Sequence, residues 1–471
     1  MKLAIIGVGY TGTSLFSMLE SMFKSQKTQI KIDLYDKACQ AGTGLAYQKD
    51  VDSNILNRPA KAMYMNDKQD FLRWIMSSNP ELVEVSPDSF LKRSLFGDFL
   101  KEKLIEVTKR YRHLGCQVSK IYHQVEDICQ IDDRWRVITE STTDIYDAVF
   151  LCTGTSVESD PYQLTGTKSY FSNPYPIHRL NSLAGRVGIL GCRLTAYDVA
   201  MGLNYSKVSH AKMLSRVSDR PRPINRYYDI ELKYLSSVGV EAFIQSRDTV
   251  TLEAVLNLIN KELRYQGITS TISQLATTKM LENGDLVTSV LAAANYSLSL
   301  LWQNLSDRSK SRLFNTFQSS WANMRVPISI QNYHAIEQLI ERGKVSHSKN
   351  VTNISFSNGE YCVEIGDEKL LFDHIINATG IRRALDRSNP ALDSLIIREL
   401  ATENQYGGIR VCPLTCSVLS KSGNTQPGLY ALGQITCGDF YMANNIDVIN
   451  NQIATLLSSF KLMSRETKAC I

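Results

Sequence analysis

The first twelve residues of this 471-residue chain constrain its fold more than any other stretch. An apolar run, Leu3 to Ile6, leads directly into Gly7, Gly9 and Gly12, at the spacing Gly-x-Gly-x-x-Gly. A short apolar run that ends in glycine is typical of a buried parallel strand. Gly7 allows a tight turn, Gly9 allows a ligand to approach the backbone, and Gly12 allows the next helix to pack closely. The stretch predicts a strand, a turn and a helix whose N-terminus attracts phosphate groups.

The residues that follow support a dinucleotide site. An amphipathic helix is predicted from the apolar positions Leu15, Phe16, Leu19 and Met22. A second strand, Ile30 to Tyr35, ends in Asp36, a carboxylate placed to accept a hydrogen bond from a ribose 2′-hydroxyl. Asp36 would repel a 2′-phosphate, so the site suits FAD or NAD and not NADP. The alternative is a glycine-rich turn without a ligand.

Composition and charge exclude several other classes of protein. The chain is 43% hydrophobic and 21% charged, which is ordinary for a soluble globular protein. The net charge of +5 is scattered without long runs of one sign, so neither nucleic acid nor a membrane is expected as partner. The ten cysteines contain no C-x-x-C pair, so we expect reduced thiols, no metal site and a cytoplasmic location.

The middle and end of the chain contain further strands that end in small residues. Residues 116–140 read as short strands in a β-meander, and 147–154 reads as a buried strand ending in Thr153-Gly154. Residues 373–380 echo this last strand. The segment 427–433 is a strand ending in Gly433, followed by a helix from about Asn445 whose N-terminus is expected under the N1/O2 edge of a flavin.

A second strand–turn–helix unit begins at Gly185. Its turn has Gly191 in the first glycine position, but Arg193 stands where the second glycine belongs. The following strand ends in Ser215-Arg216, which would suit the 2′-phosphate of NADP. Residues 250–344 have helical periodicity and are expected to pad this unit or to cover a substrate pocket.

Taken in order, these features resemble a known family. The ordered glycine turns and Thr-Gly strands resemble the flavoproteins with two dinucleotide-binding domains, and more closely the bacterial FAD/NAD(P)-binding proteins related to the class B, N-hydroxylating flavin monooxygenases. The marks of that family are Gly44-Leu45-Ala46-Tyr47, Leu56-Asn57-Arg58-Pro59, Phe71 with Trp74, Gly97, Leu194-Thr195 with Asp198, Ser215-Arg216, and Asn377-Ala378-Thr379-Gly380.

The resemblance implies where the cofactors bind. FAD would lie along the first turn, with its isoalloxazine ring near Tyr47, Asn57 and the segment 433–445. The FAD residues expected are Gly7, Gly9, Tyr10, Thr11, Gly12, Asp36, Tyr47, Asn57, Thr153, Gly154, Gly433 and Asn445. NADPH would contact Gly191, Arg193, Thr195, Ser215 and Arg216.

Three positions depart from the family pattern. Arg193 replaces a glycine and opposes close docking of a nicotinamide dinucleotide. Gln434 replaces an aspartate that many flavoproteins place at the ribitol. Trp321, Arg325 and Pro327 resemble the family's Trp…Arg-x-Pro segment, but Val326 stands where a basic residue is usual.

The resulting prediction is an α/β fold with two three-layer Rossmann-like dinucleotide-binding domains, a β-meander and a helical insertion. Residues 1–180 and 345–471 would form a discontinuous FAD domain, and 181–344 an NAD(P)-binding-like domain that carries the helical insertion. The resemblance implies an NADPH-dependent monooxygenase that hydroxylates a small amine or heteroaromatic substrate through a flavin C4a-(hydro)peroxide.

Two alternatives remain open at the level of sequence. One is an FAD oxidase or dehydrogenase that acts directly on its substrate without a nicotinamide cofactor, which Arg193 favours. The other is a flavin-binding partner protein without turnover. No catalytic side-chain set is evident, which agrees with a cofactor carrying the chemistry. The sequence leaves the substrate and the oligomeric state undetermined.

Overall fold

The computed structural model describes residues 1–23, 29–37, 41–78, 85–154, 159–217, 219–277 and 283–469. Its first sheet has six strands in the order β18-β19-β7-β1-β2-β3, and all neighbours are parallel except β18 and β19. The strands are β1 (Lys2–Ile6), β2 (Lys31–Tyr35), β3 (Gln117–Ile121), β7 (Ala148–Leu151), β18 (Ser417–Leu419) and β19 (Thr425–Ala431). The N-terminal and C-terminal parts of the chain therefore build one sheet.

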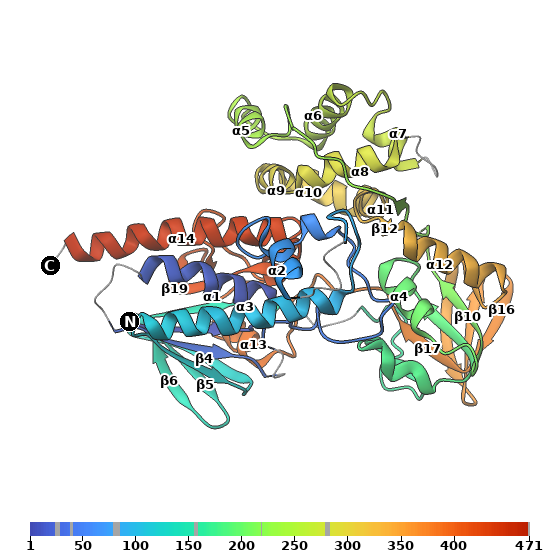
Figure 1. Cartoon of the computed structure of the whole chain (residues 1–471), viewed down its shortest axis with the longest axis horizontal. Helices are drawn as coiled ribbons and strands as arrows, with labels where there is room; N and C mark the ends of the chain where they lie inside the picture. Colours follow the sequence, from blue (N-terminus) through green and yellow to red (C-terminus); the bar gives the residue numbers. More distant parts are fainter. Residues whose placement is uncertain are drawn as a thin grey trace.

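The first sheet is covered on both faces, as its nearly continuous apolar strands require. One face carries a helical layer, and the other carries an antiparallel meander that contacts β1 and β7 (Figure 1). The helices around this unit are α1 (Tyr10–Phe23), α2 (Asp70–Ser78), α3 (Arg93–His113), α13 (Pro390–Ile397) and α14 (Ile446–Ala469). The meander strands are β4 (Val125–Ile131), β5 (Arg134–Thr139) and β6 (Thr143–Tyr146).

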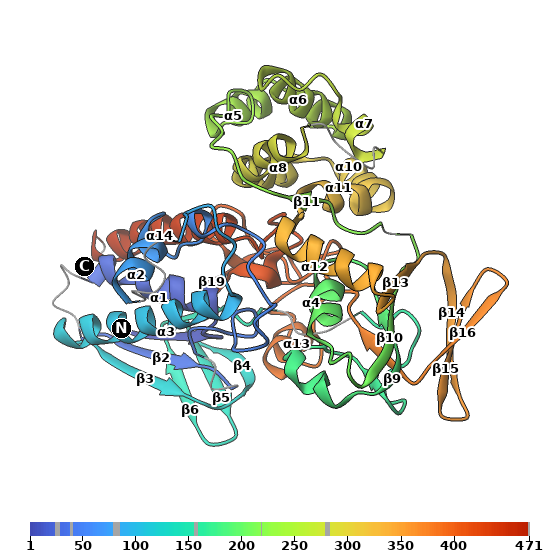
Figure 2. The same cartoon turned by 45° about the vertical axis from the view of Figure 1, so that its right-hand side comes forward.

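A second unit repeats the same plan. Its parallel five-stranded sheet has the order β13-β10-β9-β17-β8. These strands are β8 (Tyr170–Phe171), β9 (Gly185–Leu190), β10 (Val208–Leu214), β13 (Val345–Ser348) and β17 (His374–Asn377). Helices α4 (Leu194–Gly202) and α12 (Ile330–Glu341) cover one face. A second meander, β14 (Val351–Ser357), β15 (Glu360–Ile365) and β16 (Glu368–Phe372), lies on the other (Figure 2).

The pairing of the strands confirms the fold class and corrects details of the sequence prediction. The segment 117–121 joins the parallel sheet beside β2 instead of the meander. Strands β13 and β17 pair in the second sheet, so the expected return to the FAD domain at residue 345 does not match the sheets, and β8 lies before the expected boundary at 181. The reason is that β17, the strand that leads into Thr379-Gly380, pairs with β9 and so belongs to the second sheet.

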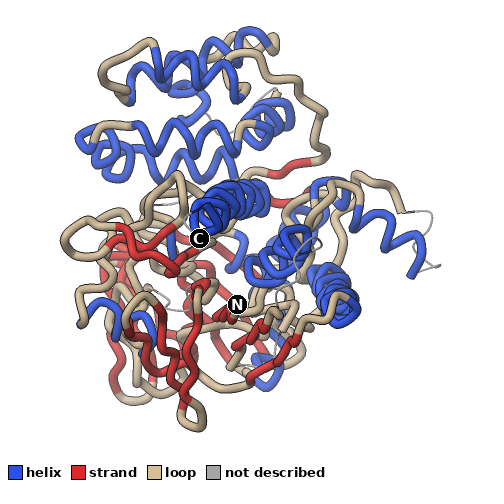
Figure 3. The backbone as a smooth tube through the Cα atoms, turned by 90° about the vertical axis from the view of Figure 1, so that its left-hand side faces the viewer, coloured by secondary structure: helices blue, strands red, loops and turns tan. Residues whose placement is uncertain are grey.

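A helical module forms the third part of the molecule (Figure 3). It consists of α5 (Ser237–Gln245), α6 (Leu252–Tyr265), α7 (Ile272–Thr277), α8 (Gly284–Ala293), α9 (Asn295–Asn304), α10 (Asp307–Arg312) and α11 (Gln318–Arg325), with a π-helical turn at Leu313–Phe317. The short parallel pair β11 (Pro223–Ile224) and β12 (Ile328–Ser329) marks its entry and exit. The module has its own apolar core.

The helical module also rests on the first unit. Helix α9 packs against α14, and the buried Trp302 indole donates a hydrogen bond to Gly438 O at 2.8 Å. The module thereby covers the C-terminal segment that follows β19. Within the described part of the chain, no helix combines the length and the apolar character needed to cross a membrane.

Candidate active site

The turn after β1 is fixed by contacts within the protein. Gly7 has φ +90°, and a Cβ there would lie 2.5 Å from Cys152 O. A Cβ on Gly12 would collide with Gly7 O, so α1 packs as closely as glycine permits. Helix α1 begins at Tyr10, and its first N–H groups face the turn because a helix N-terminus leaves them without intrahelical partners. Two glycines of the motif are therefore required by the fold itself.

Gly9 is different, because the protein leaves room beside it. A Cβ on Gly9 would meet Gly44 Cα at 3.4 Å, an ordinary van der Waals distance. The loop that contains Gly44 is held against the turn by a hydrogen bond from Gly42 N to Val8 O at 2.7 Å. The glycine at position 9 is thus not demanded by the fold, which fits a position kept small for a ligand such as a pyrophosphate.

Asp36 lies beside the same turn. It follows β2 directly, and its Oδ2 accepts a hydrogen bond from Val8 N at 3.2 Å. This contact holds the carboxylate at the carboxyl end of the sheet, next to the start of α1. The position agrees with the predicted contact to a ribose hydroxyl, and that contact stays a prediction.

The C-terminal segment meets the first turn. Gly433 has φ +74°, and a Cβ there would lie 2.7 Å from Thr11 Oγ1. Gly433 N donates to Gln452 Oε1 at 2.9 Å, which ties the end of β19 to α14. Asn445 Oδ1 accepts from Asp447 N at 2.8 Å and so caps the N-terminus of α14. Thr11 and Gly433, far apart in sequence, therefore lie side by side at one edge of the sheet, and Asn445 stands at the start of the helix to which Gly433 is tied.

Three other predicted FAD residues, Tyr10, Tyr47 and Asn57, differ in how far they are buried. The Tyr10 side chain is buried, and its hydroxyl lies within hydrogen-bond distance of two acceptors, Tyr64 O at 3.0 Å and Asn450 Oδ1 at 3.2 Å, so this side chain packs under α14. Tyr47 stands edge-on to Phe96 with ring centroids 4.9 Å apart, and burial raises the pKa of its hydroxyl. Asn57 is exposed.

The Thr-Gly end of β7 lies open beside the turn. Thr153 Cα lies 2.9 Å from the position of a Cβ on Gly7. Gly154 has φ +65°, and no described atom lies within 4 Å of where its Cβ would stand. The carboxyl edge of the first sheet therefore combines a glycine turn, a helix N-terminus, a carboxylate and open space, and these groups fit an adenine dinucleotide.

The second turn repeats the geometry of the first. Gly191 has φ +117°, and a Cβ there would lie 2.5 Å from Ala378 O. Arg193 is the N-cap of α4 with φ −107°, an ordinary backbone conformation, and burial lowers the pKa of its guanidinium. Thr195 follows in the first turn of α4. The fold accepts an arginine at this position without backbone strain.

The end of β10 brings together Ser215 and a histidine that the sequence did not indicate. Ser215 Oγ lies 3.2 Å from His347 Nε2, and Arg216 is exposed on the next position. Burial, together with nearby Arg220 and Lys349, lowers the pKa of His347, so the imidazole is neutral at pH 7. His347 reaches this place because β13 pairs with β10 in the parallel sheet. No local pattern in the sequence indicates that pairing.

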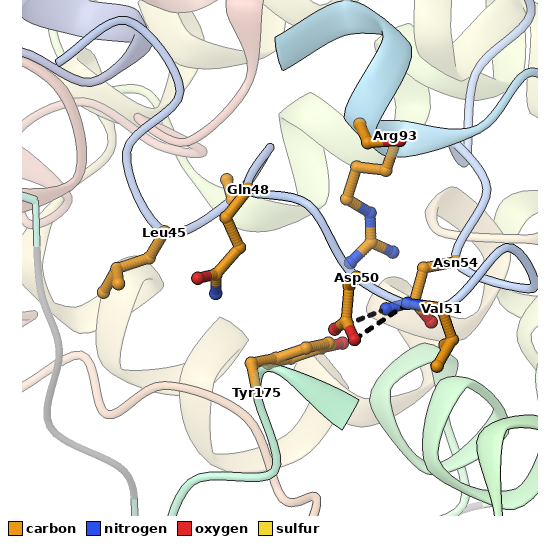
Figure 4. A pocket seen from close by; sticks show the side chains of 9 residues that line it. Leu45, Gln48, Asp50, Val51, Asn54, Arg93 and Tyr175 are labelled. Carbon is orange, nitrogen blue, oxygen red and sulfur yellow. Dashed lines mark hydrogen bonds between the residues drawn. The ribbon is translucent and has the colours of Figure 1, made fainter. Parts of the chain in front are cut away.

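A polar network joins the two dinucleotide-binding units. Arg93 Nη2 lies 3.0 Å from Asp198 Oδ2, and the Tyr175 hydroxyl donates to the same oxygen at 2.6 Å. Asp50 Oδ2 accepts from Ile177 N at 2.8 Å. Figure 4 shows Asp50, Arg93 and Tyr175 pointing into the small pocket between the units. Burial raises the pKa of Asp198 even though Arg93 and Tyr175 favour its charged form.

The site thus combines two turns that share the geometry of dinucleotide-binding turns. Among the described residues, no group of three or more histidine, cysteine, aspartate or glutamate side chains is arranged to hold a metal ion.

Comparisons with known proteins agree with this geometry. Residues 4–156 match the FAD-NAD(P)-binding family model. The Escherichia coli K12 protein YdhS is 24% identical over 310 residues, which cover 56% of this chain and 55% of YdhS. This chain therefore matches about half the length of that relative.

Two solved structures share the fold over nearly the whole chain. L-lysine 6-monooxygenase from Pseudomonas syringae has a TM-score of 0.59 at 12% identity, covering 98% of both chains. The FAD-bound cadaverine monooxygenase DfoA from Erwinia amylovora has a TM-score of 0.57 at 12% identity, covering 97% of this chain and 93% of DfoA. The N-terminal third of the chain therefore matches the FAD-NAD(P)-binding family model, and the chain as a whole shares the fold of these two monooxygenases.

Proposed function

We propose that this FAD/NAD(P)-binding oxidoreductase is an NADPH-dependent monooxygenase that hydroxylates a small amine or heteroaromatic substrate. The observation that carries the proposal is the repeated turn. Gly191 has a positive φ and packs closely against Ala378, as Gly7 does against Cys152. The second unit thus keeps the shape of a nucleotide site. Ser215 and Arg216 follow its neighbouring strand, where a 2′-phosphate would lie.

The residues of the chain would bind and orient the reactants. When bound, FAD supplies the two-electron chemistry and the reaction with oxygen. The N-terminus of α1 would hold its pyrophosphate, and Asp36 would accept from its ribose. The ion pair between Arg93 and Asp198 would fix the angle between the two units, so that nicotinamide and flavin meet in one orientation.

The helical module would contribute by excluding water. It is anchored on the segment after β19 through the Trp302 indole, which donates to Gly438 O. In the overall reaction one oxygen atom of O₂ enters the substrate and the other leaves as water. NADPH and a proton supply the two electrons and hydrogens that this requires. A covered site keeps the activated oxygen from being lost to solvent.

The experiment uses flavin-loaded protein, NADPH, isotopically labelled oxygen and a panel of small amines and heteroaromatic compounds. We expect one panel member to accelerate NADPH oxidation and to gain one labelled oxygen atom, measured by mass spectrometry. If every panel member leaves the rate of NADPH oxidation unchanged and none gains the label, the proposal of a monooxygenase with this substrate class is wrong.

Arg193 favours a second candidate, an FAD oxidase or dehydrogenase that takes a hydride directly from its substrate. In that case the guanidinium fills the second nucleotide site, because its side chain stands where phosphates usually meet the backbone. The same panel separates the candidates. A compound that reduces the flavin without NADPH and without oxygen identifies the oxidase or dehydrogenase.

A further inference from the structure

Two arginines and one aspartate meet where the helical module rests on the first unit. Arg58 Nη1 lies 3.1 Å from Asp447 Oδ2. Asn295 Nδ2 donates to the same oxygen at 3.1 Å, and the Tyr64 hydroxyl donates to Asp447 Oδ1 at 2.8 Å. Arg325 Nη2 donates to Asn295 Oδ1 and so joins the group through the amide. We name Arg58, Arg325, Asp447 and Asn295 the junction cluster.

The junction cluster is assembled from distant parts of the chain. Arg58 lies in the loop after β2, Asn295 begins α9, and Arg325 ends α11. Asp447 lies in the first turn of α14, and α9 packs directly on this helix (Figure 1). The residues can therefore meet only when the helical module is docked. A cluster of this kind forms part of a closed site, because its members come from both sides of the junction.

The charges of the junction cluster do not balance. Two guanidinium groups face a single carboxylate, and burial lowers the pKa of Arg325 to about 10, with the charge of Arg58 acting in the same direction. Arg325 is still charged at neutral pH. Asp285 is not a member of the cluster; its carboxylate accepts hydrogen bonds from Asn225 N and Arg226 N. One positive charge is left over in a buried place, which is costly unless a partner compensates it.

The hydrogen-bonding capacity of the two arginines is also not filled. Within the residues that the structure describes, Arg325 Nε and Arg58 Nη1 are buried and have no hydrogen-bond acceptor. The ion pair of Arg58 with Asp447 supplies charge but does not meet hydrogen-bond geometry at this nitrogen. Buried donors in native proteins are nearly always satisfied, so the unfilled positions point to an acceptor that the described residues do not supply, and the charge of the two arginines favours an anionic acceptor.

Aromatic side chains lie around Arg325. Arg325 lies 6.0 Å from the centre of the Trp321 ring. Tyr227 and Tyr441 are close enough that the charge of Arg325 lowers the pKa of both hydroxyls, but burial dominates and raises the pKa of Tyr227 to about 12. Both hydroxyls are therefore protonated at neutral pH. Aromatic neighbours beside a guanidinium suit an organic molecule with one negatively charged end.

The junction cluster adjoins the place predicted for the isoalloxazine ring. Asn57, which precedes Arg58, is one of the residues expected at the ring, and Asn445 caps the helix that carries Asp447. An anion bound here would stand next to the flavin. The following inference rests on the proposed function, because it identifies the ligand of this place as the substrate.

We propose that Arg58 and Arg325 bind a carboxylate of the substrate and hold its reacting end toward the flavin. A carboxylate carries one negative charge and so compensates the one positive charge left over. A phosphate dianion would instead place excess negative charge beside Asp447. Paired guanidinium–carboxylate hydrogen bonds are short and directional, so they fix orientation as well as affinity.

The test measures binding of carboxylates to the flavin-loaded protein without NADPH. The probes are acetate, propionate and benzoate, each compared with its amide, by calorimetry and by the shift in melting temperature. We expect at least one carboxylate to bind roughly tenfold or more tightly than its amide, as expected for charge-assisted hydrogen bonds. If no carboxylate binds better than its amide, the proposal is wrong.

Variants assign the binding to the two arginines. We expect Arg325→Met to remove the preference for carboxylate over amide. Arg325→Lys keeps the positive charge and serves as a second variant if Arg325→Met does not fold; we expect it to weaken the preference. Arg312→Met is the matched control, because Arg312 pairs with Glu253 on the surface of α10. Carboxylate binding that is unchanged in Arg325→Lys and Arg325→Met would overturn the assignment.

Two further outcomes separate this inference from others. If Arg325→Met shifts the midpoint potential of the flavin and no carboxylate binds to the unchanged protein, the arginines serve the cofactor and the proposal is wrong. Binding is measured without NADPH, so the two proposals can fail separately. If the protein prefers carboxylates but is not reduced by NADPH, the proposed function is wrong and the anion site is supported. If the protein is reduced by NADPH but shows no preference for carboxylate over amide, only the inference about the two arginines is wrong.

Discussion

The two turns of the dinucleotide-binding type share their backbone hydrogen bonds and differ at two of the three glycine positions of the motif. In the first, Gly7 N donates to Tyr35 O at 2.8 Å, and Cys152 N donates to Ile6 O at 2.7 Å. The second turn has the matching hydrogen bonds, Gly191 N to Leu214 O at 2.7 Å and Ala378 N to Leu190 O at 2.8 Å. The strands around both turns are thus held by the same network of backbone bonds.

The last position is Gly12 in the first turn and Ala196 in the second, and the middle position is Gly9 in the first turn and Arg193 in the second. A Cβ on Gly9 would have an ordinary contact with the protein, and Arg193 has ordinary backbone angles. Neither packing nor backbone conformation therefore requires a particular residue at this position. The comparison teaches that the first glycine is required by packing in both turns and the last only in the first turn, whereas the residue at the middle position depends on the ligand.

The largest effect is expected from the last glycine of the first turn. Gly12→Ala would push a Cβ into Gly7 O, and overpacking of this kind should lower the free energy of unfolding by about 3 kcal/mol. The matched change in the second turn is Ala196→Gly, which should cost only about 0.5–1 kcal/mol for a glycine in a helix. Urea unfolding of the flavin-free variants measures both. Equal losses would mean that the two turns are not packed differently.

The next effect concerns the middle position of the first turn. We expect Gly9→Val to keep the fold, seen by circular dichroism, and to lose FAD, because the side chain crowds the approach of the pyrophosphate and of the loop at Gly44. Gly9→Ala should weaken FAD less. Flavin content after reconstitution measures the loss. Full flavin content in Gly9→Val would show that the pyrophosphate does not approach this position.

A smaller effect is expected at the end of β10. If Arg216 binds a 2′-phosphate, Arg216→Ala should weaken NADPH by about 1.5–3 kcal/mol and leave NADH unchanged. The exposed Arg308 of α10 offers the control Arg308→Ala. Dissociation constants for both nucleotides decide the point. An equal loss for NADPH and NADH would reject the assignment of Arg216.

The smallest effect is expected from making the second turn like the first. If the Arg193 guanidinium binds the pyrophosphate, Arg193→Gly exchanges a charge contact for close backbone contact, so NADPH affinity should fall or stay within about tenfold. Flavin reduction over a range of NADPH concentrations measures it. A large gain in NADPH-driven reduction would mean that Arg193 blocks the site, and the oxidase would then be the better account.

The sequence predicted those features that depend on local pattern. The turn at Gly7 to Gly12, the strand that ends in Asp36 and the second turn at Gly191 are visible because glycine spacing and apolar runs are local. The echo between 147–154 and 373–380 was also visible, and the structure shows that each strand serves its own sheet. Sheet membership was predicted incorrectly for β3, β13 and β17, because pairing between distant strands leaves no local pattern.

The sequence could not predict the groups that assemble across the molecule. Arg58, Arg325 and Asp447 lie in three separate segments, and only the docking of α9 on α14 brings them together. His347 reaches Ser215 because β13 and β10 are neighbours. The predicted FAD contacts and the predicted NADPH contacts stay predictions, although the structure brings Thr11, Gly433 and Asp36 to one edge of the first sheet.

The central claim is that each turn binds a dinucleotide and that electrons pass from one bound dinucleotide to the other. An anaerobic titration of the purified flavoprotein, followed by flavin absorbance, tests it most directly. The account predicts that the bound flavin is FAD, that NADPH bleaches it, and that NADH does so less readily. A protein that holds FMN, or whose FAD is left oxidised by both nucleotides while a substrate alone reduces it, would contradict the account.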